Sequence, residues 1–168
     1  MIEPYIRDVP DFPKPGILFK DITPLLSDPE GLALSVRGLE QLVDPSTYDL
    51  IVGVESRGFI FGTALAHHLD KGFIPIRKPG KLPWKTASES YQLEYGEDTI
   101  EIHVDACESG RRVLMVDDLL ATGGTMEAAL KLVNRIGGEP VACAFVIELT
   151  ALDGRGRLGA PVHSLMKV

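Results

Sequence analysis

This chain contains little cysteine and no long apolar stretch. Only Cys107 and Cys143 occur among 168 residues, and their separation matches no metal-ligand spacing, which favours reduced thiols over a zinc site or a disulfide framework. No apolar run approaches the ~20 residues of a membrane-spanning helix. The first residues, Met-Ile-Glu-Pro-Tyr, lack the basic and apolar parts of a secretion signal. We therefore expect a cytoplasmic protein that contacts no membrane.

Basic residues are outnumbered, which argues against one class of partner. Seventeen Lys and Arg residues against 24 Asp and Glu residues give a net charge of −7, whereas nonspecific nucleic-acid binding needs basic surface to displace counterions. We expect no nucleic-acid partner, and an anionic substrate would need a local basic patch. The length, with 45% hydrophobic and 24% charged residues, is typical of one globular domain over residues 1–168, without repeats or low-complexity segments.

Hydrophobic periodicity predicts alternating strands and helices after a proline-rich start. This order predicts an α/β fold with a twisted, mainly parallel sheet flanked by helices on both faces. Ligands of such sheets bind beyond the carboxyl ends of the strands. We expect helices over residues 29–43, 58–69 and 122–136, and strands over residues 49–54, 73–77, 99–104, 111–116 and 140–149.

Residues 113–125 carry the most specific pattern. A buried-strand candidate, Val113–Val116, precedes Asp117 and Asp118 and then a small-residue loop that opens a helix. N–H groups at a helix start, glycine backbone and threonine hydroxyls suit a phosphate monoester. The carboxylates repel phosphate, but they can accept hydrogen bonds from vicinal hydroxyls or hold a hydrated divalent cation. Phosphate beside a diol indicates a ribose 5-phosphate, and the alternative is a plain strand–turn–helix crossover. The loop comprises Ala121, Thr122, Gly123, Gly124 and Thr125.

This stretch resembles the phosphoribosyl-diphosphate signature of the type I phosphoribosyltransferases, in which a hydrophobic strand, two acidic residues and a few variable residues precede Thr-Gly-Gly-Thr. The resemblance implies that family's fold, with an N-terminal hood over residues 1–28 and a flexible β lid over residues 79–98. It also implies Mg²⁺ as cofactor, held mainly through substrate and water near Asp117 and Asp118, and assembly as a homodimer.

Arg57 offers positive charge at the start of a predicted helix. Its guanidinium fork suits a diphosphate, although an exposed pairing with Glu55 is the alternative. The run around it resembles the diphosphate-binding loop of adenine phosphoribosyltransferases, and this resemblance implies a cis peptide between Glu55 and Ser56.

A dense basic cluster follows the second predicted strand. It is either a solvated loop or a means of electrostatic capture of the diphosphate. The resemblance implies that Arg77 reaches across a dimer interface into the neighbouring site. The cluster consists of Arg77, Lys78, Lys81 and Lys85, of which we assign the first three to substrate binding.

The polar stretch over residues 79–98 is long for a connection inside a compact domain, which is typical of a functional lid. A lid would keep water away from glycosyl transfer. Glu94 offers a proton acceptor for a base nitrogen, although an exposed hairpin carboxylate fits the pattern as well. Ser90–Gly96 resembles the family's flexible loop, which implies that Glu94 is the general acid/base. We place Tyr95 among the substrate-binding residues.

The proline-rich start contains the run Phe12–Pro24. From the pattern alone, packing of Phe19 into the core is as well supported as a role in ligand binding. The run resembles the hood of adenine phosphoribosyltransferases. This likeness implies that Phe19 stacks on a purine while backbone atoms of Leu18 and Lys20 bind the edge of the base.

Together these resemblances imply purine salvage: transfer of phosphoribosyl from 5-phosphoribosyl 1-diphosphate to adenine, giving AMP and diphosphate. One alternative is a related enzyme for xanthine, guanine or hypoxanthine, against which the hood argues. Another is a regulator that senses phosphoribosyl diphosphate without catalysis. Such regulators need a DNA-binding module, for which the chain has no spare length.

Overall fold

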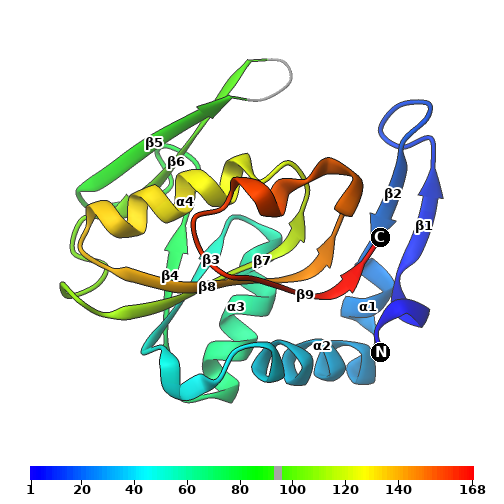
Figure 1. Cartoon of the computed structure of the whole chain (residues 1–168), viewed down its shortest axis with the longest axis horizontal. Coiled ribbons are helices and arrows are strands. Elements are labelled where there is room, and N and C mark those ends of the chain that lie inside the picture. The colour runs from blue at the N-terminus through cyan, green and yellow to red at the C-terminus, as the bar shows by residue number, and fades with distance from the viewer. Residues whose placement is uncertain (93–95) are drawn as a thin grey trace.

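A five-stranded parallel sheet forms the centre of the molecule. Its strands are β3 (Leu50–Val54), β4 (Gly72–Ile76), β7 (Arg112–Leu120), β8 (Glu139–Glu148) and β9 (Val162–Lys167). The computed structural model describes residues 1–92 and 96–168, and in it the strand order is β4-β3-β7-β8-β9 with every neighbouring pair parallel (Figure 1). The predicted mainly parallel sheet is confirmed.

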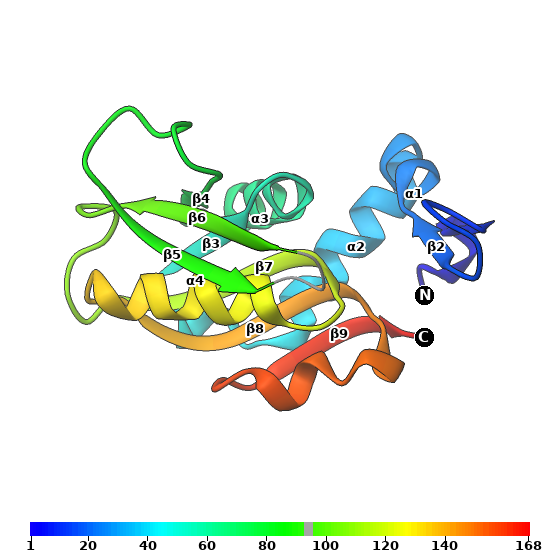
Figure 2. The same ribbon diagram turned by 90° about the horizontal axis from the view of Figure 1, so that it is seen from above.

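Two antiparallel hairpins lie outside this sheet. β1 (Arg7–Pro10) pairs with β2 (Leu18–Asp21), and β5 (Thr86–Gln92) pairs with β6 (Glu97–His103). The first falls within the predicted hood and the second mostly within the predicted lid. They stand apart at different ends of the molecule in both views (Figure 2).

Helices cover both faces of the sheet, as predicted. They are α1 (Thr23–Ser27), α2 (Pro29–Leu42), α3 (Arg57–His68) and α4 (Gly124–Arg135), with 3₁₀ turns at Glu3–Tyr5, Pro45–Thr47, Thr150–Leu152 and Gly154–Arg157. In Figure 1, α4 and the β5–β6 hairpin lie on one face and α2 and α3 on the other. Side chains along β8 alternate accordingly, because Ala144 and Val146 join the core under α2 and α3 while Cys143 and Phe145 join the core under α4.

Local chemistry explains where α2 begins and where α4 ends. The Asp28 carboxylate accepts hydrogen bonds from the N–H groups of Glu30, at 2.9 Å, and Gly31, at 2.8 Å, and Pro29 occupies the first position of α2. Beyond the end of α4, Gly137 has a φ of 93°, a left-handed conformation in which glycine ends helices without strain.

Five strands differ from the ranges predicted from hydrophobic periodicity. β7 extends through both aspartates to Leu120 instead of ending at residue 116, because its pairing with β8 continues to Glu148 and outweighs the low strand propensity of aspartate. β5 lies inside residues 79–98, where periodicity predicted no strand although the resemblance implied a β lid. It pairs only with β6, and half-buried and exposed positions mostly alternate along it, so its polar sequence carries no strand signal. β1, β2 and β9 lie outside every predicted strand range.

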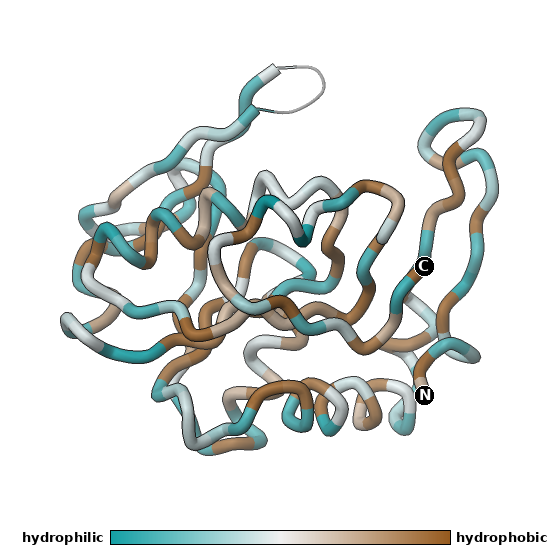
Figure 3. Tube along the Cα trace, in the orientation of Figure 1, coloured by the Kyte–Doolittle hydropathy of each residue, from teal (hydrophilic) through white to brown (hydrophobic). Residues whose placement is uncertain are grey.

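Hydrophobic residues recur along the central strands, whereas the hairpins and surface loops are mostly hydrophilic (Figure 3). Among the residues that the structure describes, no helix is both long and apolar enough to cross a bilayer.

Candidate functional site

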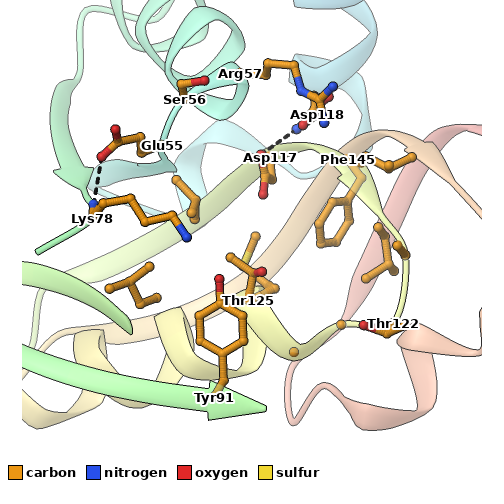
Figure 4. Close-up of a pocket in the computed structure, with 18 residues that line it drawn as sticks. Glu55, Ser56, Arg57, Lys78, Tyr91, Asp117, Asp118, Thr122, Thr125 and Phe145 are labelled. Carbon is orange, nitrogen blue, oxygen red and sulfur yellow. Dashed lines mark hydrogen bonds and ion pairs between the residues drawn. The ribbon is translucent and has the colours of Figure 1, made fainter. Parts of the chain in front are cut away.

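A cavity of about 510 Å³ opens at the carboxyl ends of β3 and β7 (Figure 4). This is the edge of the sheet at which ligands of parallel α/β proteins bind. Three segments and the β5 strand supply its polar side chains and its glycine-containing loop: Glu55, Ser56, Arg57, Lys78, Tyr91, Asp117, Asp118 and the whole loop Ala121–Thr125. The fold therefore brings together the two acidic residues, the small-residue loop, Arg57 and Lys78, all of which were predicted to bind substrate.

Glycines shape the loop that leads from β7 into α4. Gly123 has a φ of 83°, and a side chain there would place its Cβ 2.7 Å from the carbonyl oxygen of Gly154. A side chain on Gly154 would collide in turn with the carbonyl oxygen of Ala121. Backbone thus packs directly on backbone, and α4 begins at Gly124 with N–H groups that have no acceptor within the helix. The geometry suits the binding of a phosphate.

The two carboxylates at the end of β7 have different partners. Asp117 Oδ1 accepts a hydrogen bond from the Asp118 N–H at 2.9 Å, and Asp118 pairs with Arg57 Nε at 2.8 Å. Burial raises the pKa of Asp117 well above its usual range, and the charge of Asp118 adds to the rise. Burial also raises the pKa of Asp118, while Arg57 opposes that rise. Both carboxylates are therefore costly to keep ionised without a donor or a cation.

The segment after β3 supplies the opposite wall. The peptide between Glu55 and Ser56 is cis, as predicted. Glu55 Oε2 accepts a hydrogen bond from the N–H of Lys78 at 2.7 Å and lies 3.4 Å from Arg77 Nε. The alternative that Arg57 pairs with Glu55 is therefore wrong, because Arg57 is engaged by Asp118 and Glu55 by the end of β4.

The basic cluster is divided by the structure. Lys78 lines the cavity, whereas Arg77 and Lys81 do not. The guanidinium carbon of Arg77 lies 5.9 Å from the centre of the Phe59 ring, and Nη1 donates to the carbonyl of Lys81 at 3.4 Å. Lys81 and Lys85 are exposed.

The hood residues lie beside the cavity without lining it. The Phe19 ring is half-buried, meets the edge of Phe12 at 5.1 Å between centroids, and has the Arg57 guanidinium carbon 6.0 Å from its centre. Leu18 is half exposed, and Lys20 Nζ pairs with Asp8 at 2.6 Å. Phe19 is not part of either apolar core among the described residues, so the alternative of core packing is wrong.

Some lining residues were missed, and two predicted residues lie outside the described part of the chain. Glu94 and Tyr95 belong to the segment 93–95, which the structure does not describe. Phe145 and Ile100 line the cavity from β8 and β6, and nothing in the sequence distinguishes these two apolar residues from core residues. Tyr91 also lines the cavity, and its place in the Ser90–Gly96 motif is the sequence signal for it.

The donor set for a cation is small. Across residues 1–92 and 96–168, no three or more His, Cys, Asp or Glu side chains are grouped so that they could hold a metal ion. The two adjacent carboxylates Asp117 and Asp118 are the acidic pair that lines the cavity beside the phosphate-binding loop.

Comparison with known proteins gives a consistent result. The family model of the phosphoribosyl transferase domain matches residues 25–163. The adenine phosphoribosyltransferase of Koribacter versatilis is 57% identical over 166 residues, covering 98% of this chain and 91% of the relative. That of Prochlorococcus marinus is 58% identical over 163 residues, covering 96% and 95%.

Solved structures agree with these relatives. The adenine phosphoribosyltransferase of Rhodothermus marinus has a TM-score of 0.92 and 58% identity, with 99% of this chain and 96% of that chain covered. The enzyme of Saccharomyces cerevisiae, complexed with D-2,5-dideoxy-2,5-imino-altritol 1,6-bisphosphate and adenine, has a TM-score of 0.91 and 41% identity, covering 96% and 94%.

Proposed function

The chain belongs to the phosphoribosyl transferase family and, within it, to the adenine phosphoribosyltransferases, and we propose that it transfers phosphoribosyl from 5-phosphoribosyl 1-diphosphate to adenine. Adenine N9 bonds to the anomeric carbon of the ribose, the bond from that carbon to the diphosphate oxygen breaks, and one proton leaves the base. The products are AMP and diphosphate. One observation carries the proposal: a phosphate-binding loop, a carboxylate pair and two cations line a single cavity.

The 5-phosphate binds at the start of α4. Backbone N–H groups of Ala121–Thr125 and the hydroxyls of Thr122 and Thr125 donate to its oxygens. Gly123 and Gly124 let the backbone approach closely, since neither carries a side chain. Gly154 supports the loop from behind through its contact with Ala121.

Asp117 and Asp118 accept hydrogen bonds from the ribose hydroxyls, directly or through water on a cation. Arg57 and Lys78 clamp the diphosphate from the opposite wall of the cavity. Arg57 is 2.8 Å from Asp118, so its charge also stabilises that carboxylate. Arg77 and Lys81 lie farther out, and Arg77 acts in the site of a neighbouring copy.

Adenine binds between the hood and the ribose. Phe19 stacks on the purine, and backbone atoms of Leu18 and Lys20 bind its edge. A 6-amino group donates where a 6-oxo group accepts, so fixed backbone groups separate adenine from hypoxanthine. The contact of Arg57 with Phe19, at 6.0 Å, joins the base region to the diphosphate region.

Glu94 exchanges a proton with the base, and Tyr95 contacts substrate. Both assignments rest on the sequence motif Ser90–Gly96. General acid–base help of this kind is typically worth about 10²–10⁴ in rate.

Mg²⁺ fits the chemistry of the acidic pair. It binds oxygen ligands and usually keeps several waters, using one or two carboxylates together with substrate phosphates, and Asp117 and Asp118 supply two carboxylates whose ionised form burial makes costly. When bound, the ion neutralises charge on the leaving diphosphate. The same proposal includes a homodimer and a cytoplasmic location.

Diphosphate release tests the substrate. Purified protein is mixed with 5-phosphoribosyl 1-diphosphate, Mg²⁺ and adenine, hypoxanthine, guanine or xanthine in turn. We expect release with adenine and the corresponding formation of AMP. Faster release with a 6-oxopurine would reassign the substrate, and an absence of release with every base would remove the catalytic function.

A further inference from the structure

Lys78, which we propose binds the diphosphate, already has an anionic partner in this structure. Lys78 Nζ donates to Asp98 Oδ2 in a close ion pair, and the Tyr91 hydroxyl donates to the same oxygen at 3.2 Å. The other carboxylate oxygen, Oδ1, accepts the backbone N–H of Thr99 at 2.8 Å. Asp98 is therefore bonded through both of its oxygens.

The three side chains come from different strands or strand ends and occupy different depths. Lys78 follows β4 and Tyr91 lies in β5, and both line the cavity. In Figure 4 their polar tips point into the space between Asp117 and the start of α4. Asp98 lies directly opposite Tyr91 in β6 and does not line the cavity. The carboxylate thus holds the two cavity groups without itself belonging to the cavity wall.

The charge of Asp98 opposes the anion that Lys78 would bind. The hydrogen bond from Lys78 holds the pKa of Asp98 below its usual range, so Asp98 is ionised at neutral pH. An incoming diphosphate must take N–H donors of Lys78 away from this carboxylate. The Lys78 and Asp98 side chains are 39% and 28% exposed, so water can take the place of either partner. Lys78 can therefore exchange Asp98 for the diphosphate.

We propose that Asp98 is a positioning residue that competes with the diphosphate for Lys78. The inference rests on the proposed function, which puts diphosphate beside Lys78. Without ligand, Asp98 keeps the ammonium extended at the cavity wall. With ligand, the lost ion pair lowers the affinity for diphosphate, which favours release of the product.

The variant Asp98→Asn separates competition from simple support. Asparagine keeps the shape and one oxygen that can accept from Lys78 and Tyr91, but it removes the charge and the acceptor of the Thr99 N–H. We expect magnesium diphosphate to bind about fivefold more tightly by calorimetry, the effect of one partly exposed ion pair. KM for 5-phosphoribosyl 1-diphosphate should fall to a similar extent, and KM for adenine should not change. A purely supporting Asp98 predicts the opposite, weaker binding of diphosphate.

Two controls locate the effect. Glu97→Gln removes one negative charge from the neighbouring position, where the carboxylate accepts from Gln92 at 3.0 Å instead of from Lys78, and it should leave diphosphate affinity unchanged. In a Lys78→Gln background, Asp98→Asn should have no further effect. Equal tightening in Glu97→Gln, or persistent tightening without Lys78, would overturn the inference.

The outcomes also separate this inference from the proposed function. Release of diphosphate with adenine by the parent protein tests the function, whereas binding of added diphosphate by the variants tests Asp98. If Asp98→Asn shows no cooperative thermal unfolding and is therefore not folded, the same binding measurement is made on Asp98→Ser. Unchanged or weaker diphosphate binding in a folded Asp98 variant refutes the competition.

Discussion

Burial of the acidic pair sets activity against stability at the residue scale. Asp117 has a raised pKa, so its ionised form destabilises the folded chain: this cost is absent below the unfolded aspartate pKa of about 3.9 and is complete once pH passes the raised folded value. Asp117→Asn removes the cost at neutral pH and keeps the oxygen that accepts from Asp118. We expect its melting temperature to rise by a few degrees while use of 5-phosphoribosyl 1-diphosphate is largely lost.

Calorimetry without ligand and steady-state kinetics measure these two effects. If Asp117→Asn instead lowered the melting temperature, the ionised Asp117 side chain would stabilise the folded protein in the absence of ligand. The pH dependence adds a check, because activity of the parent protein should fall with decreasing pH through values above the ordinary aspartate range, as the carboxylates take up protons.

Gly58 illustrates how a residue without a side chain positions the acidic pair. A Cβ at Gly58 would lie 2.7 Å from Asp117 Oδ1, whereas a Cβ at Gly62 in the same helix would lie 2.8 Å from Phe73. Both alanine variants should reduce stability. Only Gly58→Ala should raise KM for 5-phosphoribosyl 1-diphosphate, by about tenfold or more, because it displaces a substrate-binding carboxylate. Equal KM values in the two variants would show that the contact has no influence on the site.

Glu94 can be tested independently of the described structure. Because a contact to the base should strengthen in the transition state, Glu94→Gln should lower kcat more than it raises KM for adenine, and Glu94→Leu should be slower still. Single-turnover assays measure the chemical step directly. Parental rates in both variants would exclude Glu94 as the proton acceptor.

Site residues are predictable from the sequence where their chemistry is unusual for their position. Adjacent aspartates at a strand end and threonines around paired glycines have few structural explanations, so Asp117, Asp118 and the loop after them were predictable. The ion pair between Arg57 and Asp118 was not, because the approach of two strand ends depends on sheet order. Phe145 is an ordinary core residue in sequence, and only the sheet register brings it to the cavity.

At the scale of elements, the segment after β8 supports the phosphate-binding loop. Glu148, at the end of β8, is 4% exposed and accepts two bonds from Arg155, at 2.9 and 2.6 Å, as well as one from Ser164. The N–H of Leu149 donates to the carbonyl of Leu120, the last residue of β7, at 2.9 Å. An ion pair with a buried carboxylate and a partly exposed arginine thus fixes the turn that carries Gly154.

Removing one partner of this pair should destabilise the chain. Arg155→Met leaves the Glu148 charge buried and unpaired, and we expect a loss of about 2–3 kcal/mol in the free energy of unfolding, below the full effect of a buried pair because Arg155 is 40% exposed. Arg157→Met is the matched control, since Arg157 pairs with the less buried Glu127, and should cost less than about 1 kcal/mol. Denaturant titration measures both variants, and equal losses would contradict the argument.

The pH dependence of the same pair has a defined sign. Arg155 lowers the folded pKa of Glu148, so the stability it contributes is present above the unfolded glutamate pKa of about 4.3 and is lost as pH falls through the lower folded value. Arg155→Met should therefore lose part of the acid sensitivity of the parent protein.

Elements were predictable from sequence where the hydrophobic pattern has one explanation. β3 and β8 are nearly continuous apolar runs because both of their faces are covered. β5 has the sequence Thr-Ala-Ser-Glu-Ser-Tyr-Gln and pairs only with β6, so polarity concealed it. β9 is half-buried along most of its length, and only its pairing with β8 makes it a strand.

At the scale of the whole molecule, the arrangement of Arg77 bears on assembly. Lys78 faces the cavity of its own chain, while neighbouring Arg77 lies over Phe59 and outside that cavity. The proposed role of Arg77 therefore places it in the site of a second copy of the chain. A symmetric dimer would give each site one such residue from its partner.

Mixing two inactive variants tests this arrangement. Arg77→Ala and Asp118→Asn should each be nearly inactive alone. When they are unfolded and refolded together in equal amounts, half of the dimers contain one chain of each kind. If Arg77 acts across the interface, one of the two sites in such a dimer has both residues intact, so about a quarter of the parental activity returns. If Arg77 acts in its own chain, every site has one defect and no activity returns. Light scattering on the mixture verifies that dimers formed, and a monomer would refute the proposed assembly directly.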